Sequence, residues 1–394
     1  MLLAVAIPLL YVQCFRPGAS LDSPSSTDRS ASLGPELWAM ANVDPGAMRV
    51  TAATTPLDAA TAWSRQLDAP VVAPIVTDGQ AIYVALKDGR LLALSVEDGS
   101  DLWTAPVPGR LNAAPTVAGD ALYLGLRGGR VSALDRATGE TRWLATVGES
   151  TSNAPAVVDG VVWVNGGRKI FALDTETGRE LWSRGLRPDL AFGSPLVGSD
   201  HVILRTKNRV LFFDSGSGSK SFSARVRDAA HVSVGHGIVV AVTPQLTVTF
   251  DADSSLPWWD HGRNALAWLH LLGILPELPV PPHRWSQNMV CEPRAPVIQP
   301  HQVVLACGDG TVRAHDLLSG DLLWEASGAP IVGSPVLTAS GLLMAEREAL
   351  VLLDPESGAE LDRRPLDEVE LREFFVTASG IYLLTQSDRL VALR

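Results

Sequence analysis

The sequence contains little cysteine and little positive charge. Only 3 of the 394 residues are cysteine, and none forms a Cys-x-x-Cys pair or a Cys/His cluster with zinc-ligand spacing. This argues against a disulfide-rich scaffold or a zinc domain, and we predict no metal site. The formal net charge is −11. Nucleic-acid-binding domains usually carry a basic face, so we also predict no nucleic-acid partner.

The longest apolar run of the chain lies at its start. Met1–Val12 is too short to cross a bilayer and is typical of the apolar core of a secretory signal. Cys14 follows at a position that resembles the lipidated cysteine of bacterial lipoproteins. We therefore predict a signal or lipoprotein-like segment over residues 1–14, Cys14 as the lipidation candidate, and a location on the periplasmic side of the cell envelope, anchored to the outer membrane. A frayed apolar tail is the alternative.

The next segment, residues 15–54, is rich in Ser, Pro, Ala and Gly. Such a composition buries too little apolar surface to become ordered by itself. We predict a flexible linker between the membrane and the folded domain.

A repeat begins after this segment. Trp63, Trp103, Trp143 and Trp182 are 40, 40 and 39 residues apart, and each of the last three follows a copy of an Asp-x-x-Ser/Thr-Gly pattern or a close variant. The intervening residues alternate in polarity between turn signals, which is typical of short strands. A period near 40 with this content predicts an all-β fold, an eight-bladed β-propeller built of four-stranded antiparallel blades.

The recurring pattern within the repeat has a physical explanation. The Asp carboxylate can accept backbone N–H groups of the turn, and Gly takes the positive φ that closes it. The Trp ring is predicted to wedge between neighbouring blades, with its indole N–H needing a partner. The predicted docking residues are Trp63, Trp103, Trp143, Trp182, Trp285 and Trp324.

The propeller domain is predicted to span residues 55–394. The last copy of the repeat stops before a fourth strand, and the missing strand is present near Trp63, so the N-terminal strand is predicted to complete the final blade. Seven blades is the alternative, if the copy that follows Phe222 is misread. The eight predicted blades are 64–103, 104–143, 144–182, 183–222, 223–259, 285–324, 325–362, and 363–394 joined with 55–63.

An apolar insertion, residues 260–284, breaks the period. Asn264 can cap a short helix over Ala265–Leu275, and this helix is apolar nearly all round. One interpretation is that the insertion packs on the propeller. The other is that it contacts a partner or a membrane, with Trp268, Leu271 and Leu272 as candidate residues.

Two cysteines lie beside the sixth blade. Cys291 precedes its predicted first strand, and Cys307 ends its second strand, so the two ends of this hairpin lie on the same side. A disulfide between them is a candidate in an oxidising compartment, and two buried thiols are the alternative.

The phrase Ala-Leu-Asp-x-x-Thr-Gly-x-x-x-Trp resembles the repeat of PQQ-like propellers. The chain is most similar to the BamB family of outer-membrane protein assembly lipoproteins. This resemblance implies a non-enzymatic scaffold, a monomeric propeller within a complex, that binds protein partners in the cell envelope. It also implies docking through Leu186 and Arg187, although Pro188 stands where the family has Gly.

Two other functions stay open. A ligand- or polysaccharide-sensing propeller would use one face of the ring. A PQQ-dependent dehydrogenase would need a calcium site of oxygen ligands and a carboxylate base, and its relatives also use adjacent cysteines. The chain has no Cys-Cys pair, and the recurring acids are explained by the turn. We therefore predict no catalytic residues and no cofactor.

Overall fold

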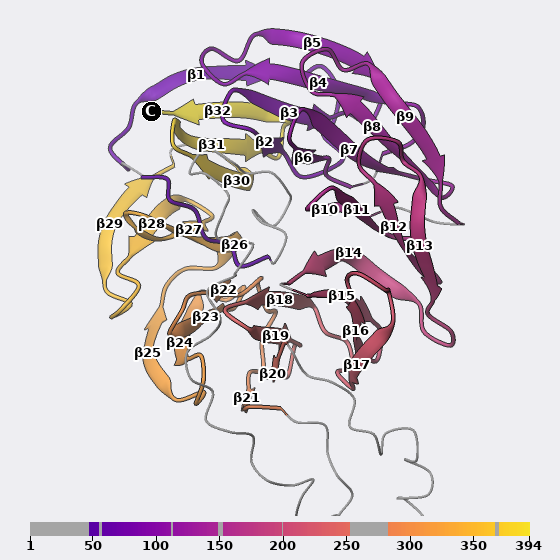
Figure 1. Cartoon of the computed structure of the whole chain (residues 1–394). Coiled ribbons are helices and arrows are strands. Elements are labelled where there is room, and N and C mark those ends of the chain that lie inside the picture. The colour runs from indigo at the N-terminus through magenta and orange to yellow at the C-terminus, as the bar shows by residue number, and fades with distance from the viewer. Residues whose placement is uncertain are drawn as a thin grey trace, which may run out of the picture.

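The computed structural model describes residues 47–54, 57–111, 113–148, 153–198, 200–252, 283–366 and 370–394. Within these ranges all regular elements are strands, and they form eight four-stranded antiparallel sheets arranged as a ring (Figure 1). The predicted eight-bladed β-propeller is confirmed. The described part of the chain contains no helix long and apolar enough to span a membrane.

Each blade uses consecutive strands except the eighth, which ends on β1. The first four blades are β2 (Val76–Thr77), β3 (Ala81–Ala85), β4 (Arg90–Ser95), β5 (Asp101–Pro106); β6 (Thr116–Ala118), β7 (Ala121–Leu126), β8 (Arg130–Asp135), β9 (Thr141–Thr146); β10 (Ala156–Val158), β11 (Val161–Asn165), β12 (Lys169–Asp174), β13 (Glu180–Gly185); β14 (Ala191–Val197), β15 (His201–Thr206), β16 (Val210–Asp214), β17 (Lys220–Ala224). The other four are β18 (His231–Gly235), β19 (Ile238–Val242), β20 (Leu246–Asp251), β21 (Ser286–Asn288); β22 (Val297–Ile298), β23 (Gln302–Ala306), β24 (Thr311–Asp316), β25 (Leu322–Ser327); β26 (Ile331–Thr338), β27 (Gly341–Glu346), β28 (Ala349–Leu353), β29 (Glu360–Pro365); β30 (Leu371–Thr377), β31 (Gly380–Thr385), β32 (Arg389–Leu393), β1 (Thr61–Gln66).

The ring closes through its two ends, as predicted. β1 pairs antiparallel with β32, with Trp63 opposite Ala392 and Gln66 opposite Arg389. Closure removes the open sheet edge that the last three-stranded blade would otherwise present. The first strands of successive blades are neighbours, so they surround the centre of the ring, and the fourth strands form its rim.

Antiparallel connections give the ring two distinct faces. Turns between second and third strands lie on the same face as the connections between blades, and we call this the crossover face. Turns from first to second and from third to fourth strands, including the Asp-x-x-Thr-Gly turns, lie on the other side, the turn face. First strands therefore run from the crossover face to the turn face.

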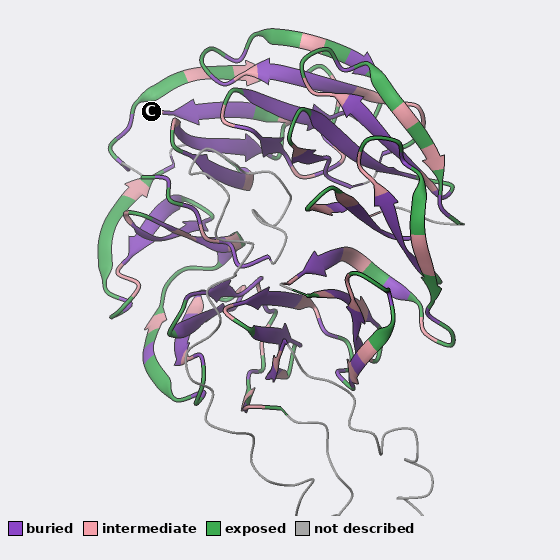
Figure 2. Cartoon of the chain, in the orientation of Figure 1, coloured by how far each residue is buried: buried purple, intermediate pink, exposed green. Residues whose placement is uncertain are grey.

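Burial follows the position of a strand in its blade. Second and third strands such as β7 and β8 are buried along nearly their whole length, whereas fourth strands such as β9 alternate between exposed and half-buried residues. Figure 2 shows this contrast as purple inner strands and a green rim. The inner strands read as continuous apolar runs because both of their faces pack against neighbouring blades.

Two predicted blade boundaries, 223–259 and 285–324, are wrong. The fourth strand of blade five is β21, which pairs with β20, and Trp285 directly precedes it. The insertion therefore lies inside blade five, between its third and fourth strands, and Trp285 leads into the fourth strand of blade five instead of opening blade six. Each of the other Trp-bearing fourth strands also continues three residues past its Trp, as from Trp103 to Pro106.

Residues 47–53, which the sequence analysis assigned to the linker, pack against the ring. Ala47, Met48 and Ala53 are buried among residues of blades four to eight. Val50 forms a parallel bridge with Leu337 of β26. Figure 1 shows this segment in indigo, running from the rim across β26 toward the centre. We call residues 47–53 the N-terminal strap.

Several predictions fall on residues outside the described ranges. These are the lipidation candidate Cys14, the helix over 265–275, and the candidate contact residues Trp268, Leu271 and Leu272 of the insertion. They stay predictions.

Inter-blade latches and a candidate docking surface

Each of the six predicted docking tryptophans lies between its own blade and the next one. Its indole Nε1–H donates to a backbone carbonyl in the third-to-fourth-strand turn of the following blade, at 2.8 to 3.3 Å. Because a buried indole N–H is costly to leave unpaired, this bond fixes the indole ring between the two blades. The pairs are Trp63 with Val96, Trp103 with Arg136, Trp143 with Thr175, Trp182 with Ser215, Trp285 with Leu317, and Trp324 with Pro355.

The glycine of the receiving turn makes room for the ring. A Cβ atom on Gly178 would lie 2.5 Å from the Trp143 ring, and one on Gly139 would lie 2.7 Å from the Trp103 ring. Both glycines also have a positive φ, 67° and 74°. Glycine is thus required twice, for the turn and for the ring. The other glycines whose Cβ would overlap a Trp ring are Gly99, Gly218, Gly320 and Gly358.

The aspartate of the same turn holds the backbone that receives the Trp. Asp135 Oδ1 accepts the backbone N–H of Ala137 at 2.9 Å and of Thr138 at 3.0 Å. A side-chain hydrogen bond from Arg142, together with these turn bonds, lowers the pKa of the Asp135 carboxyl. Trp and turn therefore form one unit, which we call the Trp–turn latch. The equivalent carboxylates are Asp174, Asp214, Asp316 and Asp354.

Two seams of the described ring carry no Trp. Phe222 of blade four is buried and packs on Phe250 of blade five, with ring centroids 6.4 Å apart. Asp362 of blade seven is exposed. In both cases the following blade has no short turn to receive a Trp. Blade five has the insertion there. In blade eight the third strand, β32, and the fourth strand, β1, come from opposite ends of the chain, and Arg394 N–H donates to Ala60 O at 2.9 Å.

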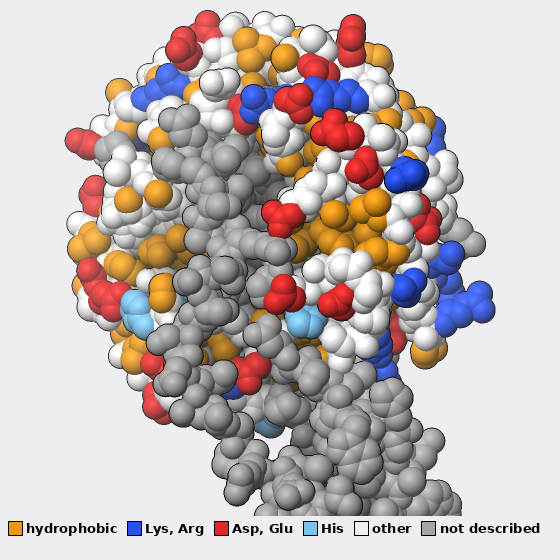
Figure 3. Space-filling view, in the orientation of Figure 1, with side chains coloured by type: hydrophobic (Ala, Val, Ile, Leu, Met, Phe, Trp, Pro, Cys, Tyr) orange, Lys and Arg blue, Asp and Glu red, His pale blue; other side chains and the backbone are white. Residues whose placement is uncertain are grey.

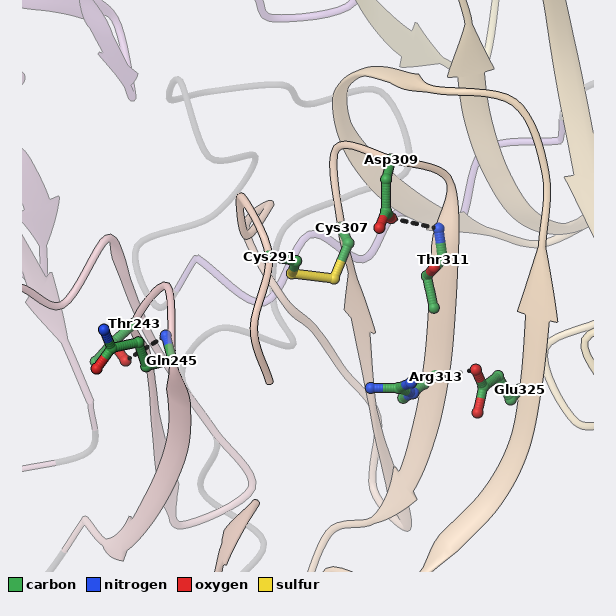
Figure 4. The surroundings of a disulfide bond; sticks show 8 residues. All are labelled: Thr243, Gln245, Cys291, Cys307, Asp309, Thr311, Arg313 and Glu325. Carbon is green, nitrogen blue, oxygen red and sulfur yellow. Dashed lines mark hydrogen bonds and ion pairs between the residues drawn. A yellow bond between two sulfur atoms is a disulfide. The ribbon is translucent and has the colours of Figure 1, made fainter. Parts of the chain in front are cut away.

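Cys291 and Cys307 are joined by a disulfide, with their Cα atoms 5.7 Å apart (Figure 4). Cys291 lies just after β21, where its N–H donates to Pro244 O of blade five at 3.1 Å. Cys307 follows β23 of blade six. The bond therefore ties the connection that leaves blade five to the second strand of blade six.

The candidate docking loop, residues 186–190, connects blade three to blade four on the crossover face. Leu186 is only 3% exposed and belongs to the core, so it does not present a side chain to a partner. Arg187 is exposed. Sequence reasoning missed Leu190 and Phe192, which are 40% and 43% exposed. The sequence did contain a signal for them, because both are apolar residues in the connection that holds Leu186 and Arg187.

A hollow of about 400 Å³ lies beside Phe192, between blades four and five. Arg205 forms its inner wall, donating from Nη1 to the carbonyl oxygens of Ala229 and of Ala230, the latter at 3.0 Å. Burial lowers the pKa of the Arg205 guanidinium. The rest of the lining is Thr206, Lys207, Asp228, Ala229 and Ala230. Apolar and charged groups therefore meet at one edge of the crossover face.

A second group of apolar side chains lies over β10, β11 and β14 (Figure 3). Val157, Val158 and Val161, which flank the turn between β10 and β11 on the turn face, are half-buried. Within the described ranges, no three His, Cys, Asp or Glu side chains gather where they could hold a metal ion. On the crossover face, Phe192 is an exposed apolar side chain that lines the hollow, and Leu190 precedes it by two residues in the same connection.

The fold, the repeat and the latches define a PQQ-like β-propeller. The family model described as outer membrane protein assembly factor BamB matches residues 46–159 and 127–256, which together are more than half of the chain. The chain belongs to this family. No curated protein is significantly similar to it.

Solved structures with the same fold are distant in sequence. BamB from Moraxella catarrhalis is 17% identical with a TM-score of 0.63, over 85% of this chain and 97% of that one. A computationally designed protein is 14% identical with a TM-score of 0.65, over 85% and 99%. Quinohemoprotein alcohol dehydrogenase from Comamonas testosteroni is 14% identical with a TM-score of 0.63, over 90% and 77%. These similarities show the fold alone.

Proposed function

We propose that the protein is a non-enzymatic scaffold of the cell envelope that binds protein partners during outer-membrane protein assembly. Membership of the BamB family supports this proposal. The observation that carries it is the exposure of Arg187, Leu190 and Phe192 along one connection between blades, in which Phe192 lines the hollow together with Asp228 and Lys207. Aromatic and Arg anchors beside a pocket are typical of the residues that dominate the binding energy of protein interfaces.

The proposed location is the periplasmic side of the envelope, with Cys14 lipidated and the propeller acting as a monomer within a larger complex. The expected signal segment and the family of the chain support this location. Metabolic labelling with a tagged fatty acid tests the anchor. Label is expected on the wild-type chain and not on Cys14→Ser.

Capture of partners from detergent-solubilised envelopes tests the scaffold. Phe192→Ser and Arg187→Glu are expected to lose the main co-purifying envelope protein. Leu181→Ser is the matched control, because Leu181 is 47% exposed but lies on the rim. Equal capture by all three variants would contradict docking at this surface. If neither the wild type nor any variant captures an envelope protein, the scaffold role is contradicted.

A ligand-sensing role is the second candidate, and the hollow favours it. Its volume of about 400 Å³ lies in the range of small-ligand sites. Arg205 and Lys207 outnumber Asp228 there, so an acidic saccharide is the favoured ligand class. A rise in melting temperature with polygalacturonate that Lys207→Ser removes would support this role. Identical melting curves with and without the polymer would contradict it.

We propose no enzymatic activity. The similarity to a quinohemoprotein dehydrogenase extends to the fold, at 14% identity. Dye reduction with ethanol, added PQQ and calcium tests this directly. No rate above the protein-free control is expected, and a rate that saturates with PQQ would overturn the proposal.

A further inference from the structure

The N-terminal strap lies on the ends of three first strands. Met48 O accepts the N–H of Ile298 of β22 at 3.1 Å. Arg49 O accepts the N–H of Leu337 of β26 at 3.0 Å, and the N–H of Thr51 donates back to Leu337 O at 2.9 Å. The strap therefore bonds to the ring through a single parallel bridge, Val50 to Leu337, and its flanking hydrogen bonds, although it is far from β22 and β26 in sequence.

Met48 enters a space that exists because residue 235 is glycine. A Cβ atom at Gly235, the last residue of β18, would overlap Met48 Sδ and Cγ. Met48 is 6% exposed and packs with Ile298 and other residues of blades five and six. An unbranched, flexible side chain such as Met suits a narrow space of this kind.

Arg49 adds polar contacts on the next blade. Its Nε donates to Pro335 O at 2.8 Å and its Nη2 to Ser334 O at 3.1 Å, both on β26. The residue is only 6% exposed. Charge-assisted bonds to carbonyl oxygens are stronger than neutral ones, so Arg49 fixes the strap in register with Met48.

The site that binds the strap is formed by strands of the propeller. Gly235 and Ile298 are the last residues of β18 and β22, and Leu337 is the last but one of β26, so all three lie at the turn face. Ring closure holds these strand ends next to one another. We propose that the ends of β18, β22 and β26 form a binding site for a peptide with an unbranched apolar side chain followed by an arginine whose backbone is left-handed, as in Arg49 (φ 60°), and that residues 47–53 are its resident ligand.

This site has a mechanical consequence, which rests on the proposed anchoring of the N-terminus. β1 closes the ring and follows the strap in the chain. A pull on the segment before residue 47 would otherwise peel β1 from β32. With the strap bound, the load reaches blades five to seven first. The docking surface on the crossover face stays free, because the strap binds on the turn face.

Trypsin cleavage after Arg49 in the full-length chain tests retention of the strap. Cleavage is expected to be slow in the wild type and at least tenfold faster in Gly235→Ala, because a clash of about 1.4 kcal/mol or more shifts the open fraction by roughly that factor. Gly198→Ala is the matched control. It lies at the corresponding turn of blade four, and its Cβ would meet other atoms only at 3.6 Å or beyond. Equal cleavage of Gly235→Ala and wild type would overturn the proposal.

A double variant distinguishes a local clash between Met48 and residue 235 from general damage to the fold. Met48→Ala removes the group that clashes with the methyl group of Gly235→Ala, so Met48→Ala/Gly235→Ala is expected to be cleaved more slowly than Gly235→Ala. If the double variant is cleaved as fast as the single one, the proposal fails.

Binding in trans tests the peptide site itself. A fluorescent peptide of residues 47–54 is expected to bind the full-length Met48→Ala chain and not the Gly235→Ala chain. The same peptide with Ala in place of Met48 is the control. Equal binding of the two peptides, or no binding of either, would overturn the site. These outcomes do not depend on anchoring or on envelope partners.

Discussion

The described ring has two kinds of boundary between neighbouring blades, those with a Trp–turn latch and those without one. Six seams carry a Trp–turn latch, and the two after blades four and seven do not. In these two, Phe222 and Asp362 occupy the Trp position, and the following blade has no short turn. A Trp is present where a turn can receive it and absent where none can. The two copies of the repeat without a Trp are therefore the two whose following blade has no short turn to accept its indole N–H.

The largest effect is expected from breaking a latch. Trp143→Ala removes a half-buried ring and the bond to Thr175 O, and it is expected to cost about 3 kcal/mol of unfolding free energy. Trp143→Phe keeps most of the ring and is expected to lose only about 1 kcal/mol. Urea unfolding monitored by circular dichroism measures both changes. Equal losses in the two variants would show that the ring contributes little.

The disulfide reinforces the boundary where the insertion interrupts blade five. Cys291→Ser and Cys307→Ser are each expected to lower the unfolding free energy by about 3 kcal/mol, because the closed loop spans 16 residues. A reductant is expected to destabilise the wild type and to leave Cys291→Ser unchanged. A wild-type melting temperature that does not respond to reductant would contradict this role.

Charge gives a third way to compare the seams. Glu373 lies on β30, the first strand beyond the unlatched seam after blade seven, and burial raises its pKa to about 7. The unfolded carboxyl ionises near its ordinary pKa of 4.5, so the folded state loses stability as pH rises from 4.5 through 7. Glu373→Gln is therefore expected to stabilise the protein by about 3 kcal/mol at pH 8 and to have little effect at pH 4. The same gain at both pH values would contradict the cause given.

The smallest effect is expected from adding a Trp to an unlatched seam. Asp362→Trp places a ring where blade eight has no Thr-Gly turn to receive it. The change in unfolding free energy is expected to stay within about 0.5 kcal/mol, as for other exposed positions. A clear stabilisation would show that a Trp can dock without its turn.

The sequence predicts the ring well because the repeat is local. Each Trp and each turn is visible within one copy, and the positions of Trp63 and the last strand predict closure. The predicted end of blade five at residue 259 was wrong because Trp258 and Trp259, directly before the insertion, match the Trp position of the repeat. The fourth strand of the blade in fact follows Trp285.

What the sequence could not predict depends on contacts between distant segments. The strap has the Ala-rich composition of a linker, and only the ends of three later strands make it ordered. Leu186 was taken as a docking residue from its family pattern, but the packing of blades three and four buries it. The exposed Leu190 and Phe192 could be recognised only once that packing was known.

A double-mutant cycle on one latch tests the central claim most directly. Gly178→Ala introduces a methyl group against the Trp143 ring, whereas Gly160→Ala has a similar positive φ but only Thr175 Oγ1 within 4 Å, at 3.9 Å. In the wild type, Gly178→Ala is expected to lower the unfolding free energy clearly more than Gly160→Ala does. In a Trp143→Ala background the two substitutions are expected to cost the same. An excess cost at Gly178 that persists without the Trp143 ring would contradict the pairing of Trp and turn.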